Sequence, residues 1–554
     1  MTGYAATDRL EDPMPQLTAL PPDFHVFDTT LRDGAQQEGL RLSVADKIAI
    51  AALLDELGVG FVEGGWPGAN PNDTAFFAAM ADGVLPLHRA ELVAFGFTRR
   101  VGGKAADDPL TAALRNSRAP VACIVAKSHD RHVEQALRTT LAENLEMITD
   151  TVAHLRAEGQ RVFVDCEHFF DGFRENPDYA LEVVHTAAAA GAEVVVLCDT
   201  NGGMLPPWVG DIVTSTAAAT GARLGIHAHN DSGCAVANTL AAVDAGATHV
   251  QGTVNGYGER TGNADLITVA ANLELKYEWP VLSVGSLAEA TRISHAIAEV
   301  TNVPMSARQP YVGLSSFAHK AGLHASAIKV DPNLYQHIDP QLVGNDMRML
   351  VSDMAGRANI QIKGSELGFD LSDRGLAAKI TDQVKAAEAA GYTYESADAS
   401  FELLLRRELG QLPDYFSVDS WRVFTSHDHD GSVDTEASLK LTAFGSTSRV
   451  LGEGNGPVNA LDHAVRNALT PHYPEVEKFE LLDYRVRILD QNHGTDATVR
   501  VLIQTTDGRH AWTTVGVGQN LIQASWEALA EAYLYGLIHS PQRLFADQSV
   551  PAGF

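Results

Sequence analysis

Cysteine is scarce in this sequence. Only four of the 554 residues are cysteines, at positions Cys123, Cys166, Cys198 and Cys234. None belongs to a CxxC pair, and the first three lie within apolar runs typical of strands. This spacing argues against both a disulfide framework and a zinc site. We therefore expect buried free thiols and a reducing compartment, the cytoplasm.

Positively charged residues are also few. The chain has 41 Lys and Arg against 70 Asp and Glu, a formal net charge of −29. Nucleic acids and anionic membrane surfaces are bound by basic surfaces, so we expect neither as a partner. No apolar run reaches the roughly 18–20 residues of a membrane span. Residues 1–22 are polar, contain proline and lack the apolar core of a signal peptide, which predicts a loose N-terminal arm.

Short β-rich runs recur along the first half of the chain, separated by helix-like stretches. The predicted strands are 25–30, 60–65, 92–98, 121–127, 161–167, 193–200, 224–230 and 249–255. Eight strands that alternate with helices predict an α/β fold, the (β/α)₈ TIM barrel. The alternative is an open doubly wound sheet, which usually has fewer strands. No GxGxxG follows the first run, and this also disfavours the open sheet.

The helix-like stretches carry terminal signals of their own. One of them is 43–58 and another is 233–246. Ser43 followed by Asp46 resembles a capping box, and Gly58 is a plausible C-cap. These signals support the alternation of strands and helices.

Polar residues end nearly every predicted strand. They are Asp28, Glu63, Thr98, Lys127, Glu167, Asp199 with Thr200, the pair His227 and His229, and Asn255. The carboxyl ends of barrel strands open onto one face, where active sites lie. Strands also end in polar loops for purely structural reasons, but that does not explain such a reactive set. The pattern therefore predicts an active site at this face.

The segment LGIHAHNDSG (224–233) places His227 and His229 two residues apart in a strand, so both side chains point to one face. Asp33 follows the first strand, which is next but one to the seventh in a closed barrel. Two histidines and one carboxylate form a metal site with open positions for substrate. Mn²⁺, Co²⁺, Zn²⁺ or Fe²⁺ suits these ligands, and Mg²⁺ does so if the substrate adds oxygens. The alternative is a pair of histidines that lie at the surface or that support a site without binding its metal.

Two neighbouring segments add to this predicted site. Arg32 precedes Asp33 and can stabilise an oxyanion beside a metal, although an ordinary salt bridge is the alternative. The segment 255–265 follows the eighth strand and has residues that allow tight turns. Within it, Asn263 is a candidate fourth ligand, and Glu259 and Arg260 can pair with each other.

Four motifs in order, DTTLRDGAQ, HAHND, NGYGERTGNADL and FAHKAGLHASAI, resemble the family of 2-isopropylmalate, homocitrate and citramalate synthases, the DRE-TIM group. The resemblance runs from about residue 24 to the C-terminus. It implies condensation of acetyl-CoA with a 2-oxo acid, followed by thioester hydrolysis. The loop FVEGGWPGANPND (61–73) resembles the citramalate branch, whose acceptor is pyruvate. A divalent metal ion (Mn, Mg, Zn or Co) is the implied cofactor.

The resemblance also implies roles for individual residues. Asp33, His227, His229 and Asn263 match the metal ligands or their close neighbours. Arg32 matches the group that stabilises the developing alkoxide. Thr200 matches the threonine that binds the carboxylate of the oxo acid. Glu167 matches the base that removes the acetyl methyl proton, although a supporting partner of Arg32 or of a histidine is the alternative.

Two further residues lie beyond the barrel. His324 and Tyr335 match residues of a helical subdomain that, in relatives, reaches over the barrel of the partner subunit, where the histidine assists proton transfer and the tyrosine closes the site. Without the resemblance, each would be interpreted as a helix-face or loop residue. The Arg-Asp pair differs from the Arg-Glu of homocitrate synthases, and no cysteine-rich lid like that of 3-hydroxy-3-methylglutaryl-CoA lyase is present.

The C-terminal part contains a weak internal repeat of three strands and a helix. A glycine-rich turn, GEGNG or GVGQN, precedes each helix. Free N–H groups at a helix N-terminus favour a carboxylate, so Gly454, Gly456 and Gly518 are candidate effector contacts, unless they only permit tight turns. The repeat resembles the dimeric regulatory domain of 2-isopropylmalate synthases, which implies a homodimer and an amino-acid effector, isoleucine or else leucine. HDHD (427–430) is interpreted as a solvated turn.

These patterns predict four parts: a loose arm (1–22), the catalytic TIM barrel (23–285), helical linker subdomains (286–411) and a C-terminal α+β regulatory and dimerisation domain with a duplicated βββα unit (412–554). The expected activity is acyl transfer from acetyl-CoA to pyruvate in isoleucine biosynthesis. Three alternatives stay open: 2-oxoisovalerate as acceptor in leucine biosynthesis, carbon–carbon cleavage by a metal-dependent lyase or aldolase, and non-catalytic sensing of amino acids. The intact set of reactive residues argues against the last.

Overall fold

The computed structural model describes residues 20–351, 356–427, 429, 431–489 and 496–540. Most of the predicted arm (1–22), as well as Asp428 and Asp430 of HDHD, lies outside the described residues. The chain divides into two compact units. The first comprises the described residues up to Phe317 with Ile338–Asp346, and the second comprises Ala318–His337 with the described residues from Met347 onward.

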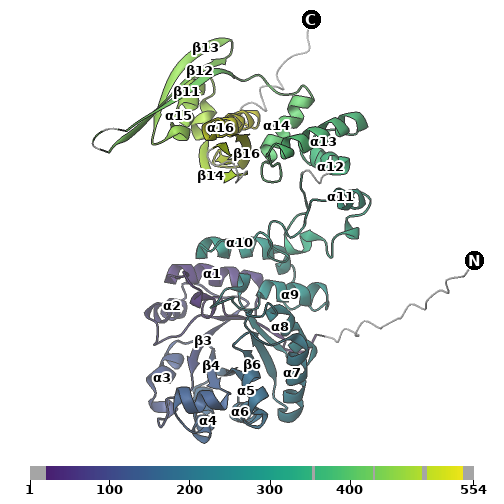
Figure 1. The fold of residues 1–554 in the computed structure, drawn as a ribbon. Helices are drawn as coiled ribbons and strands as arrows, with labels where there is room; N and C mark the ends of the chain where they lie inside the picture. The colour runs from purple at the N-terminus through teal and green to yellow at the C-terminus, as the bar shows by residue number, and fades with distance from the viewer. Residues whose placement is uncertain (1–19, 352–355, 428, 430, 490–495, 541–554) are drawn as a thin grey trace, which may run out of the picture. The chain divides into compact units, whose positions relative to one another are not determined.

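Eight parallel strands form a closed barrel in the first unit (Figure 1). They are β1 (His25–Asp28), β2 (Phe61–Glu63), β3 (Glu91–Phe97), β4 (Val121–Lys127), β5 (Arg161–Glu167), β6 (Val194–Asp199), β7 (Leu224–Ala228) and β8 (His249–Gly252). Each strand pairs with the next, and β1 pairs with β8 to close the barrel. The predicted TIM barrel is therefore confirmed.

Helices follow the strands and surround the barrel. They are α1 (Val44–Leu57), α2 (Pro71–Ala81), α3 (Pro109–Asn116), α4 (Leu141–Ala157), α5 (Phe169–Glu175), α6 (Pro177–Ala189), α7 (Pro206–Thr220), α8 (Ala235–Asp244), α9 (Leu266–Leu275) and α10 (Ala290–Thr301). The predicted capping box of α1 is present: Ser43 Oγ accepts from Asp46 N–H, and Asp46 accepts from Ser43 N–H. Gly58 ends this helix with φ of 86°.

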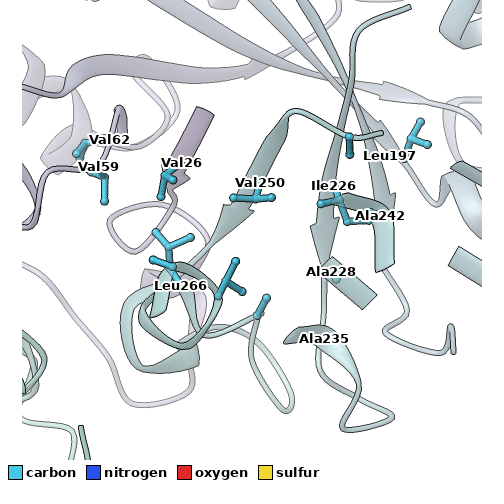
Figure 2. Close-up of a cluster of buried hydrophobic side chains, with 14 of the residues drawn as sticks. Val26, Val59, Val62, Leu197, Ile226, Ala228, Ala235, Ala242, Val250 and Leu266 are labelled. Atoms are coloured by element: carbon cyan, nitrogen blue, oxygen red, sulfur yellow. The ribbon is translucent and has the colours of Figure 1, made fainter. Parts of the chain in front are cut away.

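The strands bury both of their faces, and alternate residues point to opposite sides. Val26, Ile226 and Val250 face outward and pack in the large cluster between strands and helices, together with Ala242 of α8 (Figure 2). A second cluster fills the barrel interior with inward-facing residues: Phe27, Phe61, Val93, Val121, Cys123, Phe163, Val194, Val196 and Cys198. The barrel is thus a packed core, and side chains beyond it at the strand ends are free to form a site.

All four cysteines are free thiols. Cys123, Cys166 and Cys198 are buried in the barrel strands, as predicted. Cys234 is only half-buried, because it precedes the first residue of α8 instead of lying in a strand. None of the helices in the described part of the chain combines the length and the apolar character needed to cross a bilayer.

The second unit contains the linker helices and a duplicated motif. Its linker elements are β9 (Ala318–His319), α11 (Gly322–Ile328), β10 (Arg348–Met349), α12 (Arg357–Glu366), α13 (Arg374–Ala389) and α14 (Asp398–Glu408). The first motif comprises β11 (Ser417–His427), β12 (Val433–Ala443), β13 (Ser446–Gly454) and α15 (Pro457–Leu469). The second comprises β14 (Glu480–Ile488), β15 (Val499–Thr506), β16 (Ala511–Gly518) and α16 (Leu521–Ile538).

Each motif is a three-stranded antiparallel sheet that packs its buried face against its own helix and the shared core. On β12 the inward residues alternate through Ala437, Leu439 and Leu441, and on β15 through Val501 and Ile503. The duplicated βββα unit predicted from the sequence is confirmed.

Candidate active site

Three buried side chains converge at the carboxyl ends of β1 and β7. His227 Nε2 lies 3.2 Å from Asp33 Oδ2, and His229 Nε2 lies 3.7 Å from the same oxygen. The two Nε2 atoms are 3.3 Å apart. All three residues are buried, and their ligand atoms are close enough to hold one metal ion. The predicted same-face geometry of the two histidines is therefore present, although β7 ends one residue before His229.

Unpaired atoms around this cluster fit a cation. Asn263 Oδ1 is buried without a hydrogen-bond partner, while its Nδ2 donates to Tyr257 O at 2.9 Å. An isolated β-bridge joins Asn263 to His229. Amide oxygen, carboxylate and imidazole are all established metal donors. The donor set that the chain assembles here suits a divalent ion.

The electrostatics of the cluster favour an ionised Asp33 beside a neutral His229, whereas Asp33 raises the pKa of the buried His227. Burial alone raises the pKa of Asp33, but Arg32 and the two histidines hold it below its ordinary value. Burial, reinforced by His227, lowers the pKa of His229 to about 4. An ionised Asp33 and a neutral His229 are the forms that bind metals.

Arg32 is held between two carboxylates. Its Nε donates to Glu63 Oε2 at 2.7 Å, and its Nη1 lies 3.4 Å from Asp33 Oδ2. Its guanidinium also lies 4.0 Å from the centroid of the Phe95 ring. These three contacts fix the orientation of the guanidinium, as an oxyanion-binding group requires.

Arg32, Asp33, Glu167, Thr200 and both histidines line one cavity of about 240 Å³. The cavity is also lined by Gln36, Trp66, Phe95, Phe97, Val125, Asp165, Cys198, Glu259 and Arg260. Gln36, Trp66, Glu259 and Arg260 lie in segments that follow the strands, which is where barrel active sites lie. Six residues predicted separately from the sequence thus share one space.

Thr200 and Glu167 enter this cavity from neighbouring strands. Thr200 Oγ1 accepts from His168 N–H at 2.8 Å, which leaves its hydroxyl proton available to a substrate. Glu167, the last residue of β5, pairs with Lys127, the last residue of β4. The predicted pairing of Glu259 with Arg260 is wrong: Arg260 forms two 2.8 Å bonds to Asp231, because that carboxylate lies in the adjacent loop.

His324 and Tyr335 belong to the second unit. Their rings stack with centroids 4.1 Å apart and an interplanar angle of 30°. His324 lies in α11, and Tyr335 follows a short helical turn. The two predicted residues are therefore neighbours of each other.

The candidate effector glycines differ in what they permit. A Cβ at Gly454 would lie 2.6 Å from Ala460 N, so glycine is needed for α15 to approach β13. Gly456 precedes α15 and has open space around it, and Gly518 ends β16 with only ordinary contacts. Steric need therefore explains Gly454 but not the other two. His427 ends β11, so the HDHD segment begins at a hairpin.

Sequence reasoning assigned no role to several residues around the site. Glu63 and Lys127 were recognised only as polar strand ends, and Gln251, Asp165 and Phe97 were not recognised at all. Asp165 lies two residues before Glu167 in β5, so both side chains point to the inward face of the strand. This alternation is the feature of the sequence that could have identified Asp165.

The barrel and its cluster place the chain in a known class of proteins. The sequence profile of the HMGL-like family matches residues 23–296. A homocitrate synthase post-HMGL domain-like profile matches residues 311–391, and the LeuA allosteric (dimerisation) domain matches residues 395–537. The protein is thus an HMGL-like barrel joined to a LeuA-type allosteric domain.

Curated relatives narrow this class. The chain is 64% identical over 529 residues to the (R)-citramalate synthase of Streptomyces coelicolor, covering 95% of this chain and 99% of that one. It is 46% identical over 517 residues to the (R)-citramalate synthase of Aquifex aeolicus, with 93% and 98% covered. Identity to the 2-isopropylmalate synthase of Lysinibacillus sphaericus is 29% over 515 residues, with 92% and 96% covered. The chain belongs to the (R)-citramalate synthase family.

Proposed function

We propose that the protein condenses acetyl-CoA with pyruvate and hydrolyses the thioester, releasing (R)-citramalate and free CoA. The observation that carries this proposal is the 64% identity to an (R)-citramalate synthase over 99% of that relative. The shared cavity of Arg32, Asp33, Glu167, Thr200 and the two histidines supports it, because each residue has a role in this chemistry.

Asp33, His227, His229 and Asn263 would hold a divalent ion, Mn²⁺, Mg²⁺, Zn²⁺ or Co²⁺. Such an ion, when bound, supplies Lewis-acid polarisation of the keto group of the oxo acid. The chain supports this role by keeping Asp33 ionised and by burying all three converging donors.

Arg32 and Thr200 act on the two polar ends of the oxo acid. The Arg32 guanidinium, oriented by Glu63, stabilises the negative charge that develops on the keto oxygen when the carbonyl is attacked. The Thr200 hydroxyl donates to the carboxylate of the substrate. Both side chains are positioned before substrate arrives, so little reorganisation is needed during the reaction.

Glu167 is the proposed base that removes a proton from the acetyl methyl group. Its carboxylate lines the cavity, and the ion pair with Lys127 orients it. By resemblance, His324 and Tyr335 act at the barrel of a partner subunit in this proposal, where the imidazole moves a proton and the phenol closes the site. Their mutual stacking fixes the two rings as one group.

Aromatic side chains favour a small acceptor. Trp66 packs on Phe97 at 4.8 Å and on Phe95 at 5.9 Å between ring centroids, and all three line the cavity. The methyl group of pyruvate needs less room than the isopropyl group of 2-oxoisovalerate, the acceptor in the alternative 2-isopropylmalate reaction. The lower identity of 29% to a 2-isopropylmalate synthase agrees with this preference.

Regulation follows from the second unit. We expect a homodimer formed through the LeuA-type domain and an amino-acid effector near Gly456 and Gly518, isoleucine before leucine. Isoleucine is the expected end product of the pathway that citramalate enters. A cytoplasmic location agrees with the four free thiols.

Release of free CoA from acetyl-CoA tests the function. We expect turnover with pyruvate in the presence of Mn²⁺ or Mg²⁺, at a kcat/KM at least about tenfold above that with 2-oxoisovalerate. Chiral analysis of the product should give (R)-citramalate. A preference for 2-oxoisovalerate would transfer the protein to the 2-isopropylmalate reaction, and absence of turnover with either acceptor would contradict the proposed activity.

A further inference from the structure

A line of polar side chains runs through the barrel interior beneath the candidate metal site. It comprises His227 of β7, Gln251 and His249 of β8, and His25 of β1, with Asp165 of β5 at its side. All five residues are buried. Buried polar groups at this depth are costly unless each finds a partner, so their hydrogen bonds have defined directions.

Gln251 lies at the branch point of this line. Its Oε1 is 2.8 Å from His227 Nδ1, and its Nε2 is 3.0 Å from Asp165 Oδ1 and 3.3 Å from His249 Nε2. An amide oxygen only accepts and an amide nitrogen only donates. His227 Nδ1 must therefore carry a proton, and His249 Nε2 must accept one.

The remaining bond agrees with this direction. Burial lowers the pKa of His249 well below its ordinary value, so the ring is neutral and carries one proton. Since Nε2 accepts from Gln251, that proton lies on Nδ1, which donates to His25 Nδ1 at 3.2 Å. Every member of the line then has a consistent role.

The reversed orientation of Gln251 would lose the hydrogen bond to Asp165 and would force a different tautomer on His227. Its oxygen would face the carboxylate of Asp165, and its nitrogen would require a bare Nδ1 on His227. That proton would move to Nε2, the atom that faces Asp33 at 3.2 Å and His229 at 3.3 Å. A protonated Nε2 cannot bind a metal ion.

We propose that Gln251, held by Asp165 and His249, is the positioning residue that fixes the His227 tautomer and presents its Nε2 lone pair to the metal. This inference rests on the metal site of the proposed function. Hydrogen bonding behind a ligating histidine typically contributes 10–100-fold to metal affinity. Here the partner is an amide at the centre of a closed network, instead of a carboxylate or a backbone carbonyl.

The test is Mn²⁺ affinity of the metal-free full-length protein, measured by titration of the free-ion electron paramagnetic resonance signal. Gln251→Met preserves length and burial but removes all three hydrogen bonds of the amide, so we expect Kd to rise 10–100-fold. Gln160→Met is the matched control. Gln160 is also buried, but its amide donates to Leu114 O and Ala119 O, away from the site, so Kd should stay unchanged.

A double variant tests whether the direction of the hydrogen bonds, and not only their presence, determines metal affinity. Gln251→Glu with Asp165→Asn gives His227 an acceptor again and lets the new amide donate to the new carboxylate, while His249 takes its other tautomer and donates from Nε2 to that carboxylate. Kd should return to within about threefold of the wild-type value. A purely structural role would not produce this rescue. Thermal unfolding in EDTA reports whether each variant is folded.

The outcomes distinguish failure of the proposed role of Gln251 from failure of the proposed metal site. Unchanged Kd in Gln251→Met, an equal rise in Gln160→Met, or a folded double variant that binds more than tenfold weaker would each overturn the role of Gln251. If the wild-type protein binds neither Mn²⁺ nor another divalent ion, the proposed metal site fails as well, and this inference with it.

Discussion

Charge at the centre of the site is distributed over a few buried residues. Arg32 contacts both Glu63 and Asp33, and burial raises the pKa of Glu63 above its ordinary value despite that arginine. Asp165, which lines the same cavity, also has a pKa raised by burial. Asp33 is the carboxylate whose pKa is lowered, by Arg32 first and then by His227. The residue-scale electrostatics therefore favour Asp33 as the candidate anionic ligand.

Two substitutions should separate metal binding from proton transfer. Asp33→Asn removes the ligand charge, so Mn²⁺ affinity should fall more than about 100-fold and activity with it. Glu167→Gln should lower kcat about 10²–10⁴-fold with Mn²⁺ affinity unchanged, because a general base contributes at that level. Metal titration and steady-state kinetics on the same preparations measure both.

The control for these variants is Asp211→Asn, which changes an exposed carboxylate on α7 outside the cavity. It should behave as wild type in both measurements. Full Mn²⁺ affinity in Asp33→Asn would remove Asp33 from the metal site, and normal kcat in Glu167→Gln would remove Glu167 as the base.

The loop between β2 and α2 is anchored at several points. Asp73 accepts from Trp66 N–H at 2.8 Å, and Lys47 of α1 donates to Gly64 O at 2.9 Å and also pairs with Asp73. Gly65 has φ of 128°, and a Cβ there would lie 2.4 Å from Asp73 Cγ. The loop is thus held rigidly, and Trp66 is positioned against Phe97.

Trp66, Phe95 and Phe97 form an aromatic wall of the cavity, and removing one of these rings should change the acceptor preference. Phe97→Ala removes a ring that lines the cavity, so the ratio of kcat/KM for pyruvate to that for 2-oxoisovalerate should fall about 10–200-fold. Phe173→Ala, a partly buried phenylalanine of α5 that does not line the cavity, is the control and should preserve the ratio. An unchanged ratio in Phe97→Ala would show that the wall does not set acceptor size.

At the scale of the second unit, α14 connects the linker helices to the duplicated module. Ser400 Oγ accepts from Val515 N–H of β16 at 3.0 Å and donates to Glu531 Oε2 of α16 at 2.5 Å. Nearby, Tyr392 donates to Glu527. These polar contacts join the linker and the regulatory module within the second unit.

Glu531 makes this junction sensitive to pH. Burial raises its pKa from 4.5 to about 7, so the folded state binds a proton that the unfolded state releases between those values. Stability from this group is present below pH 4.5 and is lost as pH rises through 7. Glu531→Gln should therefore be more stable than wild type at pH 8, by on the order of 1 kcal/mol.

Thermal unfolding midpoints of the two proteins between pH 5 and 8 measure this effect. The difference should grow with pH. Glu408→Gln is the control, because Glu408 has a pKa lowered by hydrogen bonds from Lys379 and Gln383 and should show no such gain. A constant difference across the pH range would contradict the protonated state of Glu531.

Much of the site could be predicted because it depends on strand order. Asp33 follows β1 and His227 lies in β7. In the closed barrel, only β8 lies between these two strands. Spacing of two residues then placed His227 and His229 together. Thr200 and Glu167 were recognised by motif, and they too lie at strand ends that face the cavity.

The barrel, the duplicated module and the converging candidate ligands follow from the sequence, because periodicity and strand order are properties of the chain alone. The contacts of Gln251 with Asp165, of Glu63 with Arg32 and of Arg260 with Asp231 are seen only in the folded chain. They join residues from different strands or loops. Their partners depend on the length and packing of neighbouring side chains in a filled interior, which no local pattern encodes.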